Sequence, residues 1–227
     1  MSLLQSTIQE IGRAMGGNVS GSQLEGVNDT IKHYAIASAV AGAVSGLVPG
    51  AGLLALLTQT GLGWASYVKI NQHLGISMKE NTAKFIASAI GSNILTNAGM
   101  LIISYAAAAI ISFIPIFGQI AAAAASAAIG YILIYTAAVI YLKLIIELVQ
   151  PDGTINVEET IDTKRIIKRI IEENNLTKII EEGRDEYKQA KRSGAIDDAI
   201  KHRRCPNCGN SVEAGQKFCS HCGSALC

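Results

Sequence analysis

The stretch FIASAIGSNILTNAGMLIISYAAAAIISFIPIFGQIAAAAASAAIGYILIYTAAVIYL, residues 85–142, decides the fold class of this chain. It holds no Asp, Glu, Lys or Arg, and Pro115 interrupts it once. A bilayer core of about 30 Å needs roughly 20 apolar helical residues, so the arms 85–112 and 119–142 are each long enough to cross it. We predict a membrane helical hairpin; the alternative is an Ala-rich hairpin buried in a soluble bundle or an oligomer.

A second uncharged block lies between Lys32 and Lys69 and is divided by Pro49-Gly50-Ala51-Gly52. Its two arms of about 15 residues would each be roughly 22 Å long, which is short for a complete crossing. A re-entrant, shallow or buried hairpin fits this length better. Pro lacks a backbone donor and Gly permits positive φ, so we predict these residues at the two hairpin tips: Pro49, Gly50, Gly52, Pro115 and Gly118.

The overall composition, 49% hydrophobic and 16% charged, argues against an ordinary soluble enzyme, because globular proteins carry about 25% charged residues. If both blocks are hairpins, the lysines beside them all fall on one side of the membrane: Lys32, Lys69, Lys79, Lys84 and Lys143. The tendency of basic residues to stay inside then predicts cytoplasmic termini and a location of the bacterial inner-membrane type.

Small and polar residues are regularly spaced inside these blocks. Ala35, Ala39 and Gly42 form a small-x-x-x-small face that favours close helix packing. Asn93, Thr96 and Asn97 belong to a polar stripe for which three interpretations stay open. The stripe bonds across helices, which we rank first, or lines a wet cavity, or marks an arm that enters the bilayer only near Ala98.

The flanking segments divide the chain further. Residues 1–32 are expected to form an amphipathic helix packed on the rest of the protein, followed by a flexible Gly/Ser/Asn-rich connection over 16–26. Residues 33–150 are the apolar helical domain. We place a boundary at Gln150-Pro151, because residues 151–204 hold twelve basic and twelve acidic residues. Their apolar stripes predict two solvated helices, separated near Asn174-Asn175.

All five cysteines lie in the last 23 residues, and four of them form two Cys-x-x-Cys pairs: Cys205, Cys208, Cys219 and Cys222. Four thiolates at this spacing close a tetrahedral Zn²⁺ shell with no open position, which predicts a structural metal site. His221 is predicted to be an exposed bystander and Cys227 a free thiol. Residues 205–224 resemble the short zinc-ribbon modules at the ends of many prokaryotic proteins, and residues 205–227 form the last predicted domain.

The apolar region carries a further resemblance. The run Ala41-Gly42-Ala43-Val44-Ser45-Gly46-Leu47-Val48-Pro49-Gly50-Ala51-Gly52, the turn at Leu74-Gly75, and Phe113-Ile114-Pro115 resemble the YcjF-type domain of unknown function. The similarity covers about residues 33–148. It implies a membrane-associated helical module working beside a GTPase, and it supplies no catalytic residue.

Searches for catalytic motifs find no G-x-x-x-x-G-K-[ST], H-E-x-x-H or G-x-S-x-G pattern, so we expect no enzyme. The sequence predicts an all-α, homo-oligomeric membrane adaptor that presents its zinc ribbon to a cytosolic protein partner. One alternative is an oligomeric pore lined by the polar stripe. Another is a tether for RNA or ribosomes through the ribbon and Arg203 and Arg204, which acidic neighbours and scarce aromatic residues disfavour.

Overall fold

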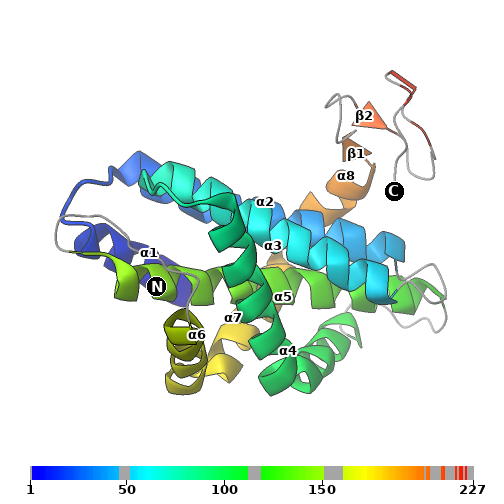
Figure 1. Ribbon diagram of the computed structural model, residues 1–227. Coiled ribbons are helices and arrows are strands. Elements are labelled where there is room, and N and C mark those ends of the chain that lie inside the picture. The colour runs from blue at the N-terminus through cyan, green and yellow to red at the C-terminus, as the bar shows by residue number, and fades with distance from the viewer. Residues whose placement is uncertain are drawn as a thin grey trace.

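The computed structural model describes residues 2–45, 52–111, 119–150, 161–201, 203–204, 211–212, 218, 220–221 and 223. These residues form an all-α protein with a small C-terminal hairpin, as predicted (Figure 1). The elements are α1 (Leu3–Ala14), α2 (Gly21–Ser45), α3 (Gly52–Leu74), α4 (Glu80–Ile111), α5 (Gln119–Leu148), α6 (Ile161–Glu173), α7 (Leu176–Arg192), α8 (Ala195–Lys201), β1 (Arg203–Arg204) and β2 (Ser211–Val212).

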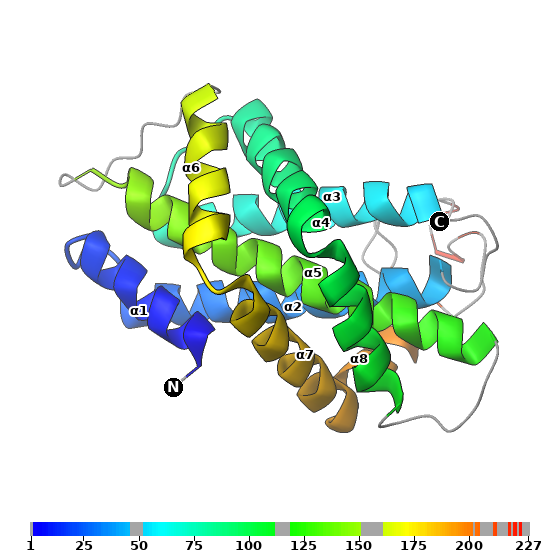
Figure 2. The same cartoon turned by 90° about the horizontal axis from the view of Figure 1, so that it is seen from below.

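Helix α5 lies at the centre of the bundle and contacts α1, α2, α3, α4, α6 and α7. Figure 2 shows it passing between these helices. Helices α4 and α5 are both long and apolar enough to cross a membrane, as the sequence predicted. Their surroundings differ, however, because 83% of the most apolar stretch of α5 is buried inside the protein against 33% of that of α4.

The helices α2 and α3 lie side by side and run in opposite directions, whereas α4 crosses α5 steeply (Figures 1 and 2). In both views the end of α2, the start of α3, the end of α4 and the start of α5 lie toward the same end of the bundle. Gly52 begins α3. The other predicted tip residues, Pro49, Gly50, Pro115 and Gly118, lie outside the described residues.

Small residues bring α2 close to α5. Ala35 and Ala39 are fully buried, and a Cβ built on Gly42 would stand 2.3 Å from the carbonyl oxygen of Ser126 in α5. No methyl group fits at that distance, so the two backbones approach as closely as they do only because position 42 is glycine. This confirms the tight packing predicted from the small-residue spacing.

The predicted flexible connection over 16–26 is wrong for its second half, because α2 already begins at Gly21. Ser20 and Gln23 form a capping box there: the Gln23 side chain accepts a hydrogen bond from the Ser20 N–H at 2.8 Å, and Ser20 Oγ accepts one from the Gln23 N–H at 3.3 Å. Helices α2 and α3 also continue past Lys32 and Lys69, so they are longer than the uncharged arms.

Helix α1 packs on the bundle as expected, with Leu4, Ile8 and Ile11 buried. Its first turn is held by α7. Glu182 accepts hydrogen bonds from the backbone N–H groups of Leu3 at 2.7 Å and Leu4 at 3.0 Å, and from the Tyr135 hydroxyl of α5 at 2.6 Å. One carboxylate therefore joins three helices and satisfies N–H groups that α1 itself leaves open.

The charged helices α6 and α7 are separate, as predicted, and Asn175 caps α7 by accepting a hydrogen bond from the Lys178 N–H at 3.0 Å. Their apolar stripes pack on α4 and α5, so residues on both sides of the predicted boundary at Gln150-Pro151 share one hydrophobic core. Burial raises the pKa of Tyr187 to about 12. The Tyr187 ring is therefore neutral at physiological pH and packs edge-on against Tyr131.

Replacing Gly42→Ala should lower the free energy of unfolding by about 2 kcal/mol, because overpacking a tight contact usually costs about 1–3 kcal/mol. Denaturation in detergent, followed by circular dichroism, measures this. Gly61→Ala is the matched control, since Gly61 is also helical and has no neighbour within 4 Å of its built Cβ. That change should be neutral or slightly stabilising, and an equal loss in both variants would contradict the close approach at Gly42.

Replacing Glu182→Ala should lower the free energy of unfolding by about 2 kcal/mol, since hydrogen bonds to a charged acceptor contribute about 1.5–3 kcal/mol. The same denaturation experiment applies. Glu172→Ala is the control, because Glu172 is exposed and meets only Lys168 at 3.7 Å, a contact of little energetic weight. Similar stabilities for the two variants would show that Glu182 does not hold α1.

Candidate metal centre

The described part of the C-terminal segment begins with an antiparallel strand pair, in which Arg203 lies opposite Val212 and Arg204 opposite Ser211. Val212 is buried. In the sequence, Cys205 follows β1 directly and Cys208 lies between the two strands. The first Cys-x-x-Cys pair therefore belongs to the connection of a short hairpin.

The second pair follows the exposed Phe218. Gly223, directly after Cys222, has a φ of +70°, a conformation that glycine adopts without the strain a side chain would bring. A tight turn after the second cysteine of a pair lets backbone N–H groups point at sulfur. Gly223 has the backbone conformation of such a turn, while Gly209, which follows Cys208 in the same way, lies outside the described residues.

The predicted zinc ligands Cys205, Cys208, Cys219 and Cys222 lie outside the described residues, as does Cys227, so their assignment stays a prediction. Arg203 and Arg204 form β1. His221 is exposed, as expected.

A family model described as a zinc-ribbon domain matches residues 204–226. This range contains all four paired cysteines, and a set of four thiolates suits a closed tetrahedral Zn²⁺ site. The C-terminal segment is therefore a zinc ribbon and binds zinc. The match does not reach the helical bundle, and no model of the YcjF type matches the chain.

No curated protein gives a significant match to this chain. No solved structure does so either.

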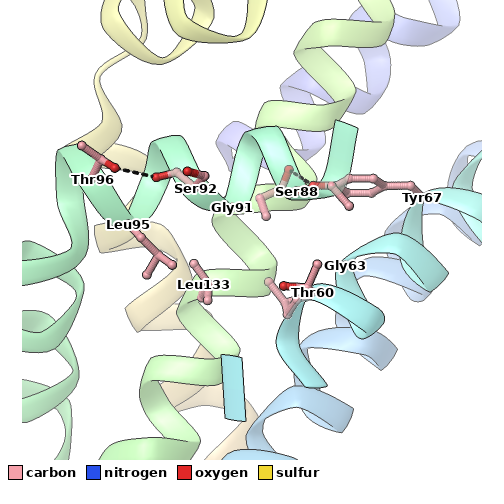
Figure 3. A pocket seen from close by; sticks show the side chains of 12 residues that line it. Thr60, Gly63, Tyr67, Ser88, Gly91, Ser92, Leu95, Thr96 and Leu133 are labelled. Atoms are coloured by element: carbon pink, nitrogen blue, oxygen red, sulfur yellow. Dashed lines mark hydrogen bonds between the residues drawn. The ribbon is translucent and has the colours of Figure 1, made fainter. Parts of the chain in front are cut away.

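A cavity of about 320 Å³ lies between α3, α4 and α5 (Figure 3). Hydroxyl groups of Thr60, Ser92 and Thr96 line it together with apolar side chains such as Leu133. Tyr67 also lines the cavity, and its hydroxyl donates a hydrogen bond to the carbonyl oxygen of Ala137 at 3.2 Å. Among the described residues, the lining contains no carboxylate, imidazole, amine or thiol.

The polar side chains of the α4 stripe form hydrogen bonds within their own helix, not across helices as we expected. Asn93 donates to the carbonyl oxygen of Ala89 at 2.9 Å, Thr96 to that of Ser92 at 2.9 Å, and Asn97 to that of Asn93 at 2.8 Å. Each bond stays within the helix that carries the side chain, so the interpretation as bonding across helices is wrong for these three residues. Side chains of this length reach the carbonyl one turn back more easily than a neighbouring helix.

Replacing Cys208→Ser should remove zinc from a protein that otherwise holds about one ion per chain, because a structural site needs all four thiolates. Metal content measured by mass spectrometry reports this. The helical circular dichroism should persist, since the hydrophobic core cluster runs from Leu4 to Ile196 and includes none of the described ribbon residues. Cys227→Ser is the control and should keep its zinc; unchanged zinc in Cys208→Ser would exclude Cys208 as a ligand.

Proposed function

We propose that this protein is a non-enzymatic, membrane-associated adaptor that presents its zinc ribbon to a cytosolic protein partner. The zinc-ribbon match carries the proposal, because such ribbons serve as protein- or nucleic-acid-binding modules. The two helices long enough to cross a membrane support association with the bilayer. Zinc, held by Cys205, Cys208, Cys219 and Cys222, keeps the small module folded, since metal binding and folding are coupled in a domain of this size.

A protein partner is favoured over nucleic acid by the charge around the ribbon. Arg203 and Arg204 form β1, but Asp197 and Asp198 lie in the helix just before it, and the whole chain has a net charge of only +1. Binding to nucleic acid depends mainly on neutralising phosphates with a surplus of basic residues. RNA or ribosome tethering through Arg203 and Arg204 is therefore the second candidate.

The pore alternative receives no support from α4, because Asn93, Thr96 and Asn97 donate their hydrogen bonds to their own helix. The proposal that the partner is a separate GTPase rests only on the resemblance of residues 33–148 to the YcjF-type domain. Homo-oligomerisation and cytoplasmic termini complete the proposal and rest on the apolar composition and the positions of the lysines.

Cells that express the full chain test both halves of this function. The wild-type protein should float with membranes in a density gradient, and affinity capture in detergent should recover one specific protein. Cys208→Ser should float equally well but lose that protein, because only the ribbon depends on zinc. A monodisperse wild-type protein in the soluble fraction would contradict membrane association. Capture of RNA that weakens steeply with added salt would favour the tether instead.

A further inference from the structure

Helix α4 turns one side away from the rest of the bundle. We define its outer face as Thr96, Asn97, Met100, Ile103, Ser104 and Ala107, all of which are exposed. Thr96 stands at the edge of this face, because it also lines the cavity between α3, α4 and α5. Met100 is 77% exposed and Ile103 49%. The opposite side of the helix, with Ile94, Ala98 and Ile102, is buried in the core. The outer face is thus a continuous surface without any charged group.

Helix α6 shows what a water-facing helix of the same protein looks like. The described α6 residues that are exposed are all charged: Lys164, Arg165, Lys168, Arg169, Glu172 and Glu173. Helix α4, by contrast, carries no charged residue after Lys84. The two helices of this one molecule therefore differ in their exposed sides: that of α6 is charged, and the outer face of α4 is not.

Each polar side chain on this face donates one hydrogen bond to its own helix. Thr96 and Asn97 donate to carbonyl oxygens one turn earlier, and Ser104 donates to that of Met100 at 2.9 Å. In water such side chains can bond solvent, but in hydrocarbon each donor must find a partner within the protein. The hydroxyl donors of Thr96 and Ser104 therefore meet this requirement, whereas Asn97, which uses one of its two amide N–H groups, belongs to the polar end of the face.

The face also changes character along its length. Thr96 and Asn97 are polar, whereas Met100, Ile103 and Ala107 are apolar and lie closer to the end of α4, with Ser104 as one hydroxyl among them. That end lies toward the same end of the bundle as the start of α5, the end of α2 and the start of α3 (Figures 1 and 2). The sequence from 85 to 142 and that between Lys32 and Lys69 is uncharged, so this end of the four helices is free of formal charge in α2 to α5.

We propose that the outer face of α4 is the surface that contacts lipid acyl chains, with Met100, Ile103 and Ala107 deeper in the hydrocarbon than Thr96 and Asn97. Helix α5 serves as the protein core and stays out of contact with lipid. This inference rests on the proposed membrane association and adds which surface carries it. This depth agrees with the third interpretation of the polar stripe, in which α4 enters the bilayer only near Ala98.

Tryptophan fluorescence tests the contact, since Trp64 is the single tryptophan of the chain. In a Trp64→Phe background, Met100→Trp and Thr96→Trp place the only indole on the outer face, and Lys168→Trp places it on α6 as the control. Each protein is bound to phosphatidylethanolamine–phosphatidylglycerol vesicles with brominated acyl chains. Bromine near the bilayer centre should quench the indole most strongly at position 100, less at 96 and not at 168.

The outcomes separate this inference from the proposed function. Failure of the wild-type protein to float with vesicles would overturn both. Flotation without quenching at position 100, or with equal quenching at 168, would overturn only the lipid contact of α4. A blue-shifted, unquenched indole at position 100, together with a dimer seen by light scattering, would assign the outer face to a second copy and also overturn the inference. Helical circular dichroism and zinc content show that each variant is folded.

As a second measurement, Met100→Arg should move the full-length protein from the floated to the unbound fraction, because an arginine is costly to bury in hydrocarbon. Lys168→Glu, which changes charge by a larger amount on α6, should float like the wild type. Equal flotation of Met100→Arg and wild type would contradict lipid contact at this position.

Discussion

The structure depends on the burial of α5, a helix without any charged residue over most of its length. Such a helix has no side suited to water, so the remaining helices must cover it or lipid must. Six of them do so here. Close cover is possible because α2 contributes Ala35, Ala39 and Gly42, whose small side chains leave room for the α5 backbone.

Polar side chains on a buried helix need partners inside the protein, and the bundle provides them for Tyr135 and Tyr141 of α5, although not for the Thr136 hydroxyl among the described residues. The Tyr141 hydroxyl donates to Asn71 at 2.6 Å, and its ring stacks on Tyr67 at 3.9 Å between centroids. The Tyr135 hydroxyl donates to Glu182, which also receives the first N–H groups of α1. These bonds connect α1, α3 and α7 to the core, because an unpaired polar group in such an interior is costly.

Charge in this protein is sorted by surface. The described exposed residues of α6 are all charged, while the exposed side of α4 after Lys84 is uncharged, and its Thr96, Asn97 and Ser104 each donate a hydrogen bond to their own helix. The zinc ribbon is stabilised differently, through metal coordination, and can therefore stay small. An adaptor of the kind proposed needs this combination: one surface for the bilayer, a helical body, and a separately stabilised module for its partner.

The sequence by itself determined the all-α class, the lengths of α4 and α5, the separation of α6 from α7 and the zinc ribbon. Each of these follows from neighbouring residues: uncharged runs, 3.6-residue periodicity, and two Cys-x-x-Cys pairs. The Ser20–Gln23 capping box is also a pattern of neighbouring residues, but the nearby glycines led us to expect a flexible connection there instead of the start of a helix. Only the tertiary structure decided that α5 is enclosed while α4 keeps an outer face, that Glu182 holds α1, and that Thr60, Tyr67 and Leu133 share a cavity. These features arise from contacts between segments far apart in the chain. The sequence makes α5 the more apolar of the two candidate spans, but composition alone does not say whether other helices or lipid will cover it.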